Sequence, residues 1–423
     1  MYKKAVQSIL LFICTFAVFQ VGYAFRTEQE PSAMDAKPAT IKVLLDRSQD
    51  GALLEVRGGY KVVDPASQKK LSAGTSGKRF FVFPLQTGLR WGEEFPGTYQ
   101  IRIEPTSHET TILLNGRQYR GAMEVYLVEK KLSSVNEVDV ESFLKSTLAK
   151  QVQPNLPSAV RDAVAIVGRT NAYYTALSNF DSFWHIDSKN VSYQGYVYAF
   201  SDVEMNRAID NTKHLVMTYD SQPFACTWTE NSAGQTASYN VILRKHVATP
   251  NGVLAEFARK DRTDSKWNFS IPTTDFARLV KTNRVSELDL FVDQKSKKVY
   301  GVRVKDGAHT KDINTVELMA LLGKQNLRST DFTVSVSNGR INFTGYGKGL
   351  GVGLCLYSAT QMSEAGELAP KILADFFPFT HLEKMRSYPE MIVTPNKHFF
   401  ISPKKKRTLS FDDQEKHNAP AGF

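Results

Sequence analysis

Cysteine is scarce in this chain, which has three among 423 residues. A small fold held together by several disulfides is therefore excluded. Cys14 lies in an apolar N-terminal segment, which leaves Cys226 and Cys355. These two could pair in an exported protein, or they could stay as two buried thiols, and the second arrangement is the one we expect.

Long hydrophobic runs are also lacking, apart from one near the start between about Ile9 and Val21. Lys3 and Lys4 precede it, and residues 22–24 (GYA) offer small side chains at both positions of a cleavage site. This pattern predicts a secretory signal peptide over residues 1–24. The alternative is an uncleaved anchor, although the run is shorter than the ~20 residues of a spanning helix. We expect an exported protein that is periplasmic or anchored to the inner membrane.

Acidic residues are in the minority, and the formal net charge is +10. A basic exported protein suits the cell wall or an anionic membrane face, whereas nucleic acid is not an expected partner. Some of the charge lies in residues 404–407 (KKKR), inside a polar segment over 386–423 that is poor in apolar residues. This composition predicts a basic disordered tail.

The remaining sequence predicts an α+β fold. After a linker over 25–40, residues 41–130 form a β-rich part, in which turn signals such as Asp50-Gly51 and Asn115-Gly116 separate short β-type runs. Residues 131–385 alternate between helical and strand patterns. The expected strands are 41–45, 53–56, 60–63, 80–83, 99–103, 111–114, 215–219, 224–228, 300–304, 332–336 and 341–344, and the expected helices are 140–152, 158–177, 273–281, 315–322, 358–364 and 370–376.

Glycines occupy every second position from 345 to 353. On an extended strand this spacing would leave one bare face, against which another chain or a sugar ring could lie closely. Neither the dinucleotide fingerprint nor the P-loop pattern fits these residues, so a phosphate-binding loop is not expected.

Residues 149–157 (AKQVQPNLP) and 168–174 (GRTNAYY) resemble the central segment of the stage II sporulation protein D (SpoIID/LytB) family. In that family the segment begins Ala-Glu-Met-Pro, and the resemblance implies that its glutamate is the acid that cleaves peptidoglycan glycan strands. The glutamate position holds Gln151 here. An amide can donate a hydrogen bond to a sugar, but it cannot deliver the proton that cleavage of a glycosidic bond needs.

Further segments resemble the same family in the same order, over about residues 41–385. They are 114–121 (LNGRQYRG), 135–144 (VNEVDVESFL), 193–195 (YQG), 229–236 (TENSAGQT), 321–323 (LLG), 327–330 (LRST), 347–359 (GKGLGVGLCLYSA) and 376–380 (FFPFT). The resemblance implies a mixed core around a glycan-binding cleft. Two histidine positions of the family hold Thr229 and Leu350, and a glutamine position holds Leu356. Some relatives use such histidines for zinc, so we expect neither a metal nor a cofactor.

The resemblance assigns candidate site residues to this cleft. Gln151 takes the position of the acid, and Glu230 is either a substitute acid or a solvated turn residue. Arg169 either contacts the ligand directly or forms one half of a structural ion pair. The aromatic side chains either stack on sugars or belong to the core. The expected substrate-binding residues are Arg169, Tyr193, Thr229, Ser232, Gly234, Gly347, Gly349, Gly351, Gly353 and Tyr357.

The family implies a role in bacterial division or sporulation. The first hypothesis is that the chain binds and remodels septal peptidoglycan as a lytic transglycosylase, or as a derivative of one, with a relocated carboxyl. The alternative is a catalytically silent glycan-binding module or amidase enhancer, which the loss of the glutamate favours. A third hypothesis is a protein-binding component of the envelope. Implied partners are denuded glycan strands, an N-acetylmuramoyl-L-alanine amidase and division proteins.

Overall fold

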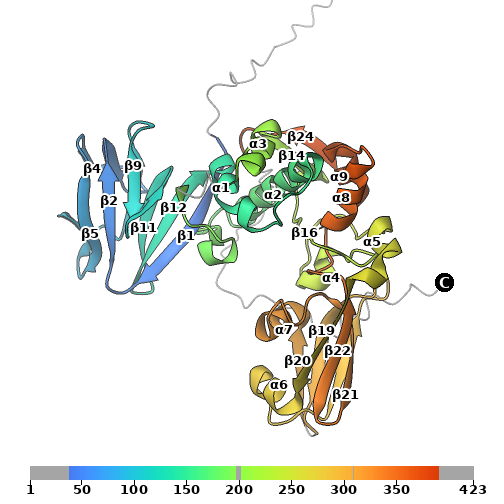
Figure 1. Cartoon of the computed structure of the whole chain (residues 1–423). Helices are drawn as coiled ribbons and strands as arrows, with labels where there is room; N and C mark the ends of the chain where they lie inside the picture. The colour runs from blue at the N-terminus through green and yellow to red at the C-terminus, as the bar shows by residue number, and fades with distance from the viewer. Residues whose placement is uncertain (1–37, 197–201, 308, 390–423) are drawn as a thin grey trace, which may run out of the picture. The chain divides into compact units, whose positions relative to one another are not determined.

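The computed structural model describes residues 38–389, except 197–201 and 308 (Figure 1). The predicted signal peptide, most of the linker and nearly all of the basic tail lie outside the described residues. Within those residues, no helix has both the length and the apolar character needed to cross a membrane. The strands and helices together form an α+β fold, as predicted.

The N-terminal part is a sandwich of two antiparallel sheets with a short parallel addition (Figure 1). One sheet has the order β13-β1-β12-β11-β8-β3-β4 and the other the order β10-β9-β2-β5-β6-β7. The rings of Tyr60 and Trp91, one from each sheet, meet edge to face with centroids 5.4 Å apart. The strands are β1 (Thr40–Ser48), β2 (Ala52–Arg57), β3 (Tyr60–Val63), β4 (Lys70–Gly74), β5 (Lys78–Leu85), β6 (Gly88–Trp91), β7 (Glu93–Pro96), β8 (Gln100–Pro105), β9 (Thr111–Leu114), β10 (Arg117–Tyr119), β11 (Ala122–Val128), β12 (Lys131–Asp139) and β13 (Ile186–Asp187).

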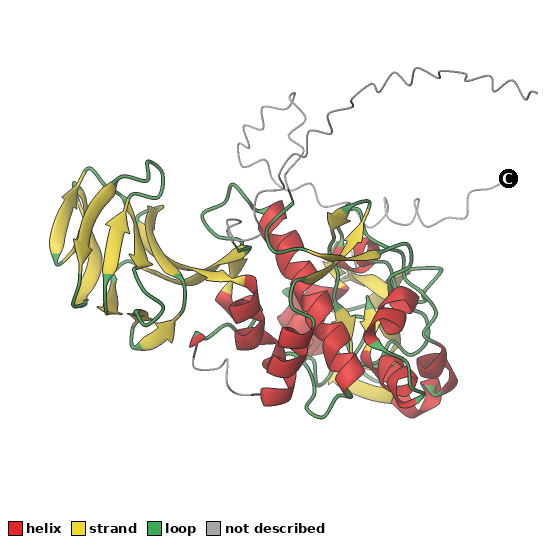
Figure 2. Cartoon of the chain, turned by 90° about the horizontal axis from the view of Figure 1, so that it is seen from above, coloured by secondary structure: helices red, strands yellow, loops and turns green. Residues whose placement is uncertain are grey.

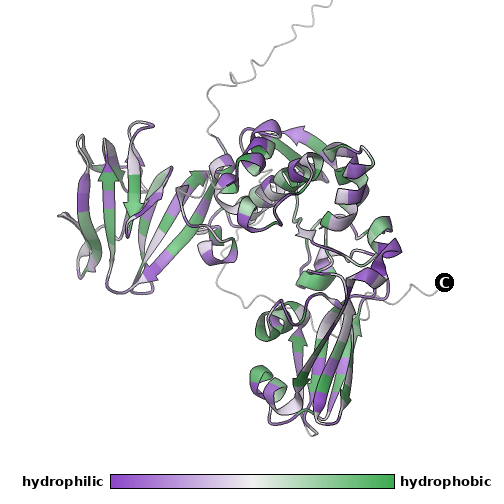
Figure 3. Cartoon of the chain, viewed as in Figure 1, coloured by the Kyte–Doolittle hydropathy of each residue, from purple (hydrophilic) through white to green (hydrophobic). Residues whose placement is uncertain are grey.

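The alternation of buried and exposed positions explains the sandwich. In β2 and β8 every second residue is buried, so each strand gives one face to the core and one to solvent. The same alternation appears in Figure 3 as bands of opposite hydropathy along the strands. β11 and β12 were not predicted, because most of their residues are buried on both faces and the period of two is lost.

A helical layer follows directly on β12 (Figure 2). Asp139 caps α1 (Val140–Thr147) by accepting a hydrogen bond from the Ser142 amide, and the 3₁₀ turn η1 (Leu148–Lys150) continues it. α2 (Ser158–Ser178) is buried on most of its sides. Packed around it are α3 (Val203–Asn211), β14 (Leu215–Tyr219), β15 (Gln222–Pro223), α8 (Leu356–Glu364), α9 (Ala369–Phe376) and β24 (His381–Lys384).

Residues 266–346, which we call the insert lobe, have a hydrophobic core of their own around Phe276, Leu318 and Phe343. The lobe contains two three-stranded sheets, with the orders β17-β22-β21 and β18-β19-β20, together with two helices. Its elements are β17 (Lys266–Pro272), α6 (Thr273–Val280), β18 (Glu287–Val292), β19 (Val299–Lys305), β20 (Thr310–Asn314), α7 (Thr315–Leu322), β21 (Asp331–Ser337) and β22 (Arg340–Tyr346). Most of these were predicted.

Between the helical layer and the insert lobe the chain is mostly irregular. Its short elements are β16 (Trp228–Thr229), α4 (Tyr239–Leu243), α5 (Glu256–Lys260) and η4 (Arg262–Ser265), and β16 pairs in parallel with β23 (Leu354–Cys355). The strand expected over 224–228 is therefore wrong except at its last residue. A further short element, η2 (Ser188–Asn190), lies between α2 and α3.

The glycine tract is not the extended strand that its spacing predicted. β22 ends at Tyr346, and Gly347, Gly349, Gly351 and Gly353 have φ between 66° and 99°. This is the left-handed region, which residues other than glycine rarely adopt. A Cβ on Gly349 would lie 2.5 Å from the Thr229 hydroxyl oxygen. The glycines therefore let the backbone turn and pass closely beside residues 227–231, and they do not form one bare face.

Candidate functional site

Gln151 stands at the end of η1, where the chain leaves the helical layer. Its backbone amide donates to the Leu148 carbonyl over 2.9 Å, and its exposed side chain donates from Nε2 to the Val191 carbonyl over 3.2 Å. The position corresponding to the family's acid is thus at the surface and is anchored only by its own amide.

Arg169 is fully buried at 0% exposure and holds α2 against its neighbours. Its guanidinium binds the Glu141 carboxylate through two bonds of 2.8 Å and also donates to the carbonyls of Ile209 and Leu215. Arg169 is thus one half of a buried ion pair, which is the second of the two arrangements expected for it. The ion pair links α1, which continues into η1, to α2.

A cleft of about 600 Å³ opens in front of Gln151. One wall comes from α1, η1 and the exposed side of α2, and another comes from residues 226–230 and 348–350. The insert lobe contributes Met319, Lys324 and Arg328. The lining mixes apolar surface, including Trp228, with the amide of Asn171 and the hydroxyl of Thr175. Ligand pockets in proteins commonly combine apolar surface with a few polar groups in this way.

A second cleft, of about 420 Å³, adjoins the first. It is lined by residues 153–157, by Ser265 and Gly347, and by the start of α8 including Tyr357. Glu230, Arg328 and Lys348 line both clefts, so the two meet at these three side chains. We call this place the junction.

The junction is set by backbone pairing between segments far apart in the sequence. Asn231 and Lys348 exchange two backbone hydrogen bonds of 3.0 and 2.8 Å, and the Gly349 amide donates to the Arg328 carbonyl over 2.8 Å. The Thr229 hydroxyl donates to the Lys348 carbonyl and accepts from the Gly351 amide. Thr229 thus fastens the glycine tract at the position where the family has a histidine.

Glu230 is the only carboxyl group among the residues that line the two clefts. One of its oxygens lies 2.5 Å from the Lys348 ammonium and 2.5 Å from the Gln153 amide nitrogen. Both of these neighbours are donors. In this arrangement the Glu230 oxygen accepts both hydrogen bonds.

The expected site residues divide into two groups. Gln151, Thr229, Glu230 and Gly349 line the first cleft, and Gly347 and Tyr357 line the second. The Tyr357 hydroxyl donates to Asp261 over 2.7 Å, and this bond raises the pKa of Tyr357 to about 12. Residues that line neither cleft are Arg169, Tyr193, Ser232, Gly234, Gly351 and Gly353.

Two members of the second group have clear structural roles. Tyr193 is buried and donates to the Asn136 side chain over 2.6 Å, and burial raises the pKa of its hydroxyl. Ser232 is also buried, and its amide points to the Cys355 sulfur at 3.3 Å. Both side chains were expected at the substrate, whereas in the structure they are buried and line neither cleft.

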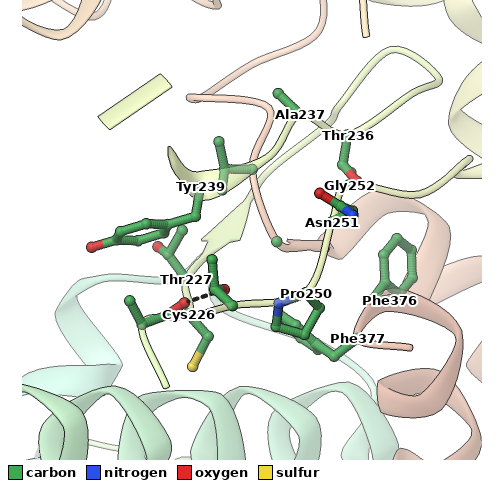
Figure 4. A pocket seen from close by; sticks show the side chains of 14 residues that line it. Cys226, Thr227, Thr236, Ala237, Tyr239, Pro250, Asn251, Gly252, Phe376 and Phe377 are labelled. Carbon is green, nitrogen blue, oxygen red and sulfur yellow. Dashed lines mark hydrogen bonds between the residues drawn. The ribbon is translucent and has the colours of Figure 1, made fainter. Parts of the chain in front are cut away.

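Cys226 and Cys355 are free and buried, which confirms the expected thiols. Figure 4 shows the Cys226 sulfur directed toward α2, where it lies 3.4 Å from the Val167 carbonyl, and burial raises the pKa of this thiol. The adjoining void, bordered by Pro250 and Phe377, has a volume of about 10 Å³. This is room for about one water molecule, so it is no ligand site. No group of three or more potential metal ligands occurs among the described residues.

The sequence analysis missed the cations of the clefts. Lys150 and Lys324 line the first cleft, and Arg328 and Lys348 line both. Arg328 was noticed only as part of a family segment, and Lys348 only as a spacer between glycines. Their meeting depends on the return of the chain from the insert lobe, which no local pattern encodes.

Part of this site matches a known family of proteins. Residues 128–219 match the family model of the stage II sporulation protein, SpoIID, and the match includes Gln151. A protein of Bacillus subtilis named "Amidase enhancer" is 23% identical over 67% of this chain and 46% of its own length. Over residues 128–219 this chain is similar to the SpoIID family. The two matches support a peptidoglycan-related role.

Other relatives carry no functional name. Uncharacterized proteins of Chlamydia muridarum and Chlamydia pneumoniae are each 32% identical over 42% of this chain. The matched segment spans 62% and 65% of those two proteins. An uncharacterized protein of Brachyspira hyodysenteriae is 23% identical over 80% of this chain.

Proposed function

We propose that this chain binds glycan strands of peptidoglycan in its two clefts and does not cleave them through position 151. The observation that carries the proposal is Gln151 itself, which lies on the wall of the larger cleft as an amide bonded to the Val191 carbonyl. An amide in this place can hold a sugar hydroxyl, but it cannot act as a general acid. The chain would then serve as a glycan-binding module or an enhancer of an amidase.

The second candidate function is lytic transglycosylase activity with a relocated acid. Glu230 supports it, since it carries the only carboxyl group among the described residues that line either cleft. The ion pair with Lys348 speaks against it, because a general acid must hold a proton and direct it at the substrate. Glu230 would have to leave Lys348 before it could act.

Incubation of the purified protein with denuded glycan strands separates the two candidates. We expect strands to be retained and no anhydro-ended products to form, as measured by co-sedimentation and mass spectrometry. Products from the unaltered protein that disappear in Glu230→Gln would favour the second candidate. Loss of retention by the folded protein would overturn the first.

Gln151→Glu is the complementary test. If the cleft is otherwise intact, the new carboxyl should introduce cleavage, since general acid catalysis contributes about 10²–10⁴-fold. Gln151→Asn is the matched control, because it alters the side chain without adding an acid. Equal inactivity of both variants, with strand binding retained, would show that position 151 does not face the scissile bond.

The setting of this function is part of the proposal. The N-terminal signal pattern and the basic composition favour export and action in the periplasm, either free or anchored to the inner membrane. An N-acetylmuramoyl-L-alanine amidase is the proposed partner, by analogy with the relative named "Amidase enhancer". A role in septal division would follow if the protein is recruited to the division septum.

A further inference from the structure

The charges at the junction of the two clefts are unbalanced. Arg328 and Lys348 both line the two clefts, and Glu230 is the single carboxylate beside them. Lys150 and Lys324 add two more cations to the wall of the first cleft. Within the described ranges, the exposed Arg328 side chain forms no ion pair, whereas Lys348 is paired with Glu230.

The pairing of Glu230 shows what the junction can hold. Its carboxylate oxygen sits between the Lys348 ammonium and the Gln153 amide, at 2.5 Å from each. The Glu230 and Lys348 side chains are 34% and 43% exposed, so solvent and ligand can reach the pair. An exposed ion pair is worth only about 0–1 kcal/mol, and it can therefore open when a competing anion arrives.

We infer that the junction is a carboxylate-binding point that reads acidic sugars, with Arg328 and Lys348 as its specificity-determining residues. This inference rests on the proposed function and adds the chemistry that the site selects. The ligand group is the carboxylate of a sugar acid, as in the lactyl group of an N-acetylmuramic residue that has lost its stem peptide. When a stem peptide is attached, an uncharged amide takes the place of that carboxylate.

In the bound state the ligand carboxylate replaces Glu230 against Lys348 and accepts a second set of bonds from the Arg328 guanidinium. Arginine suits this task, because its planar donors match the two oxygens of a carboxylate. Glu230 acts as an internal competitor that occupies the lysine until an acidic strand arrives. The neutral parts of the sugars lie along the hydroxyl, amide and apolar surfaces of the clefts on either side.

The test compares two forms of the same strand in a binding titration with the full chain. One form is a denuded glycan strand with free lactyl carboxylates, and the other is the same strand after its carboxylates have been coupled to methylamine. The unaltered protein should prefer the acidic form by about tenfold, the size expected for a charge-assisted contact. Rising salt should reduce this preference.

Three variants test whether Arg328 and Glu230 control the preference for the acidic strand. Arg328→Gln should lose the preference while it still binds the amidated strand. Glu230→Gln should bind the acidic strand more tightly, because Lys348 is no longer occupied. Arg278→Gln is the matched control, since Arg278 is exposed and lines neither cleft, and it should behave like the unaltered protein. Circular dichroism verifies that each variant is folded.

The outcomes separate the inference from the proposed function. Equal binding of both strand forms by the unaltered protein would overturn the carboxylate reading and leave glycan binding standing. An undiminished preference in Arg328→Gln, or weaker binding of the acidic strand by Glu230→Gln, would also overturn it. Binding of neither form would overturn the proposed function itself.

Discussion

Glu141→Gln should destabilise the protein strongly, because it leaves the Arg169 charge buried without its partner. The guanidinium is fully buried and donates one hydrogen bond of 2.8 Å to each carboxylate oxygen of Glu141. Glutamine keeps one oxygen for one of these bonds, and it places an NH₂ group against the other guanidinium nitrogen. Removing one partner of a buried ion pair costs about 3–5 kcal/mol of stability. Because one hydrogen bond is retained, we expect Glu141→Gln to cost about 3 kcal/mol.

The measurement is urea unfolding followed by tryptophan fluorescence, with the slope compared between variants so that midpoints report stability. Asp210→Asn is the control, because it breaks a surface pair between Lys145 of α1, the helix that carries Glu141, and Asp210 of α3, where Asp210 is 57% exposed. A surface pair of this kind contributes about 0–1 kcal/mol. If Glu141→Gln costs no more than Asp210→Asn, the argument that Arg169 is an internal fastener fails.

Two further predictions concern the glycine tract and the pH response. Gly349→Ala should cost more stability than Gly339→Ala, since the new Cβ meets the Thr229 hydroxyl at 2.5 Å, whereas at Gly339 it meets nothing and only the backbone strain of about 1–2 kcal/mol remains. Similar thermal midpoints for the two would contradict this. Burial, with a smaller effect of the Lys42 charge, lowers the pKa of His185 to about 4. Between these pH values His185 binds a proton in the unfolded chain but not in the folded one. Stability should therefore fall as pH drops from about 6.5 to about 4. His185→Asn should flatten this part of the midpoint-against-pH curve, and an unchanged slope would refute the assignment.

The elements that the sequence predicted well are those whose signals are local. β3 and β9 begin and end at the expected residues, because each is a short β-type run bounded by turn signals. α7 also begins and ends at the expected residues, and in the structure Asn314 caps its first turn by accepting from the Glu317 amide. These signals need no knowledge of the rest of the chain.

The failures have long-range causes. A period of two in the glycine tract fits an extended strand and also fits a backbone that turns at every second residue, and the close passage beside residues 227–231 decides between them. Arg169 could have faced solvent or a ligand until the position of Glu141 was known. The family resemblance brought Gln151 and Gly349 to one cleft, whereas the cations of the junction follow from the course of the chain through the insert lobe.

The insert lobe leaves the rest of the chain and returns to it at one place. Lys266 pairs with Tyr346 across β17 and β22, and the Gly347 amide donates to the Ser265 carbonyl over 3.1 Å. An excursion whose two ends touch can be exchanged, enlarged or trimmed with little effect on the frame that carries it. The insert lobe supplies Met319, Lys324 and Arg328 to the first cleft. Replacing the lobe would therefore change which glycan strands bind, while the wall that carries Gln151 stayed the same. The architecture thus separates the part that can acquire new selectivity from the part that would carry chemistry.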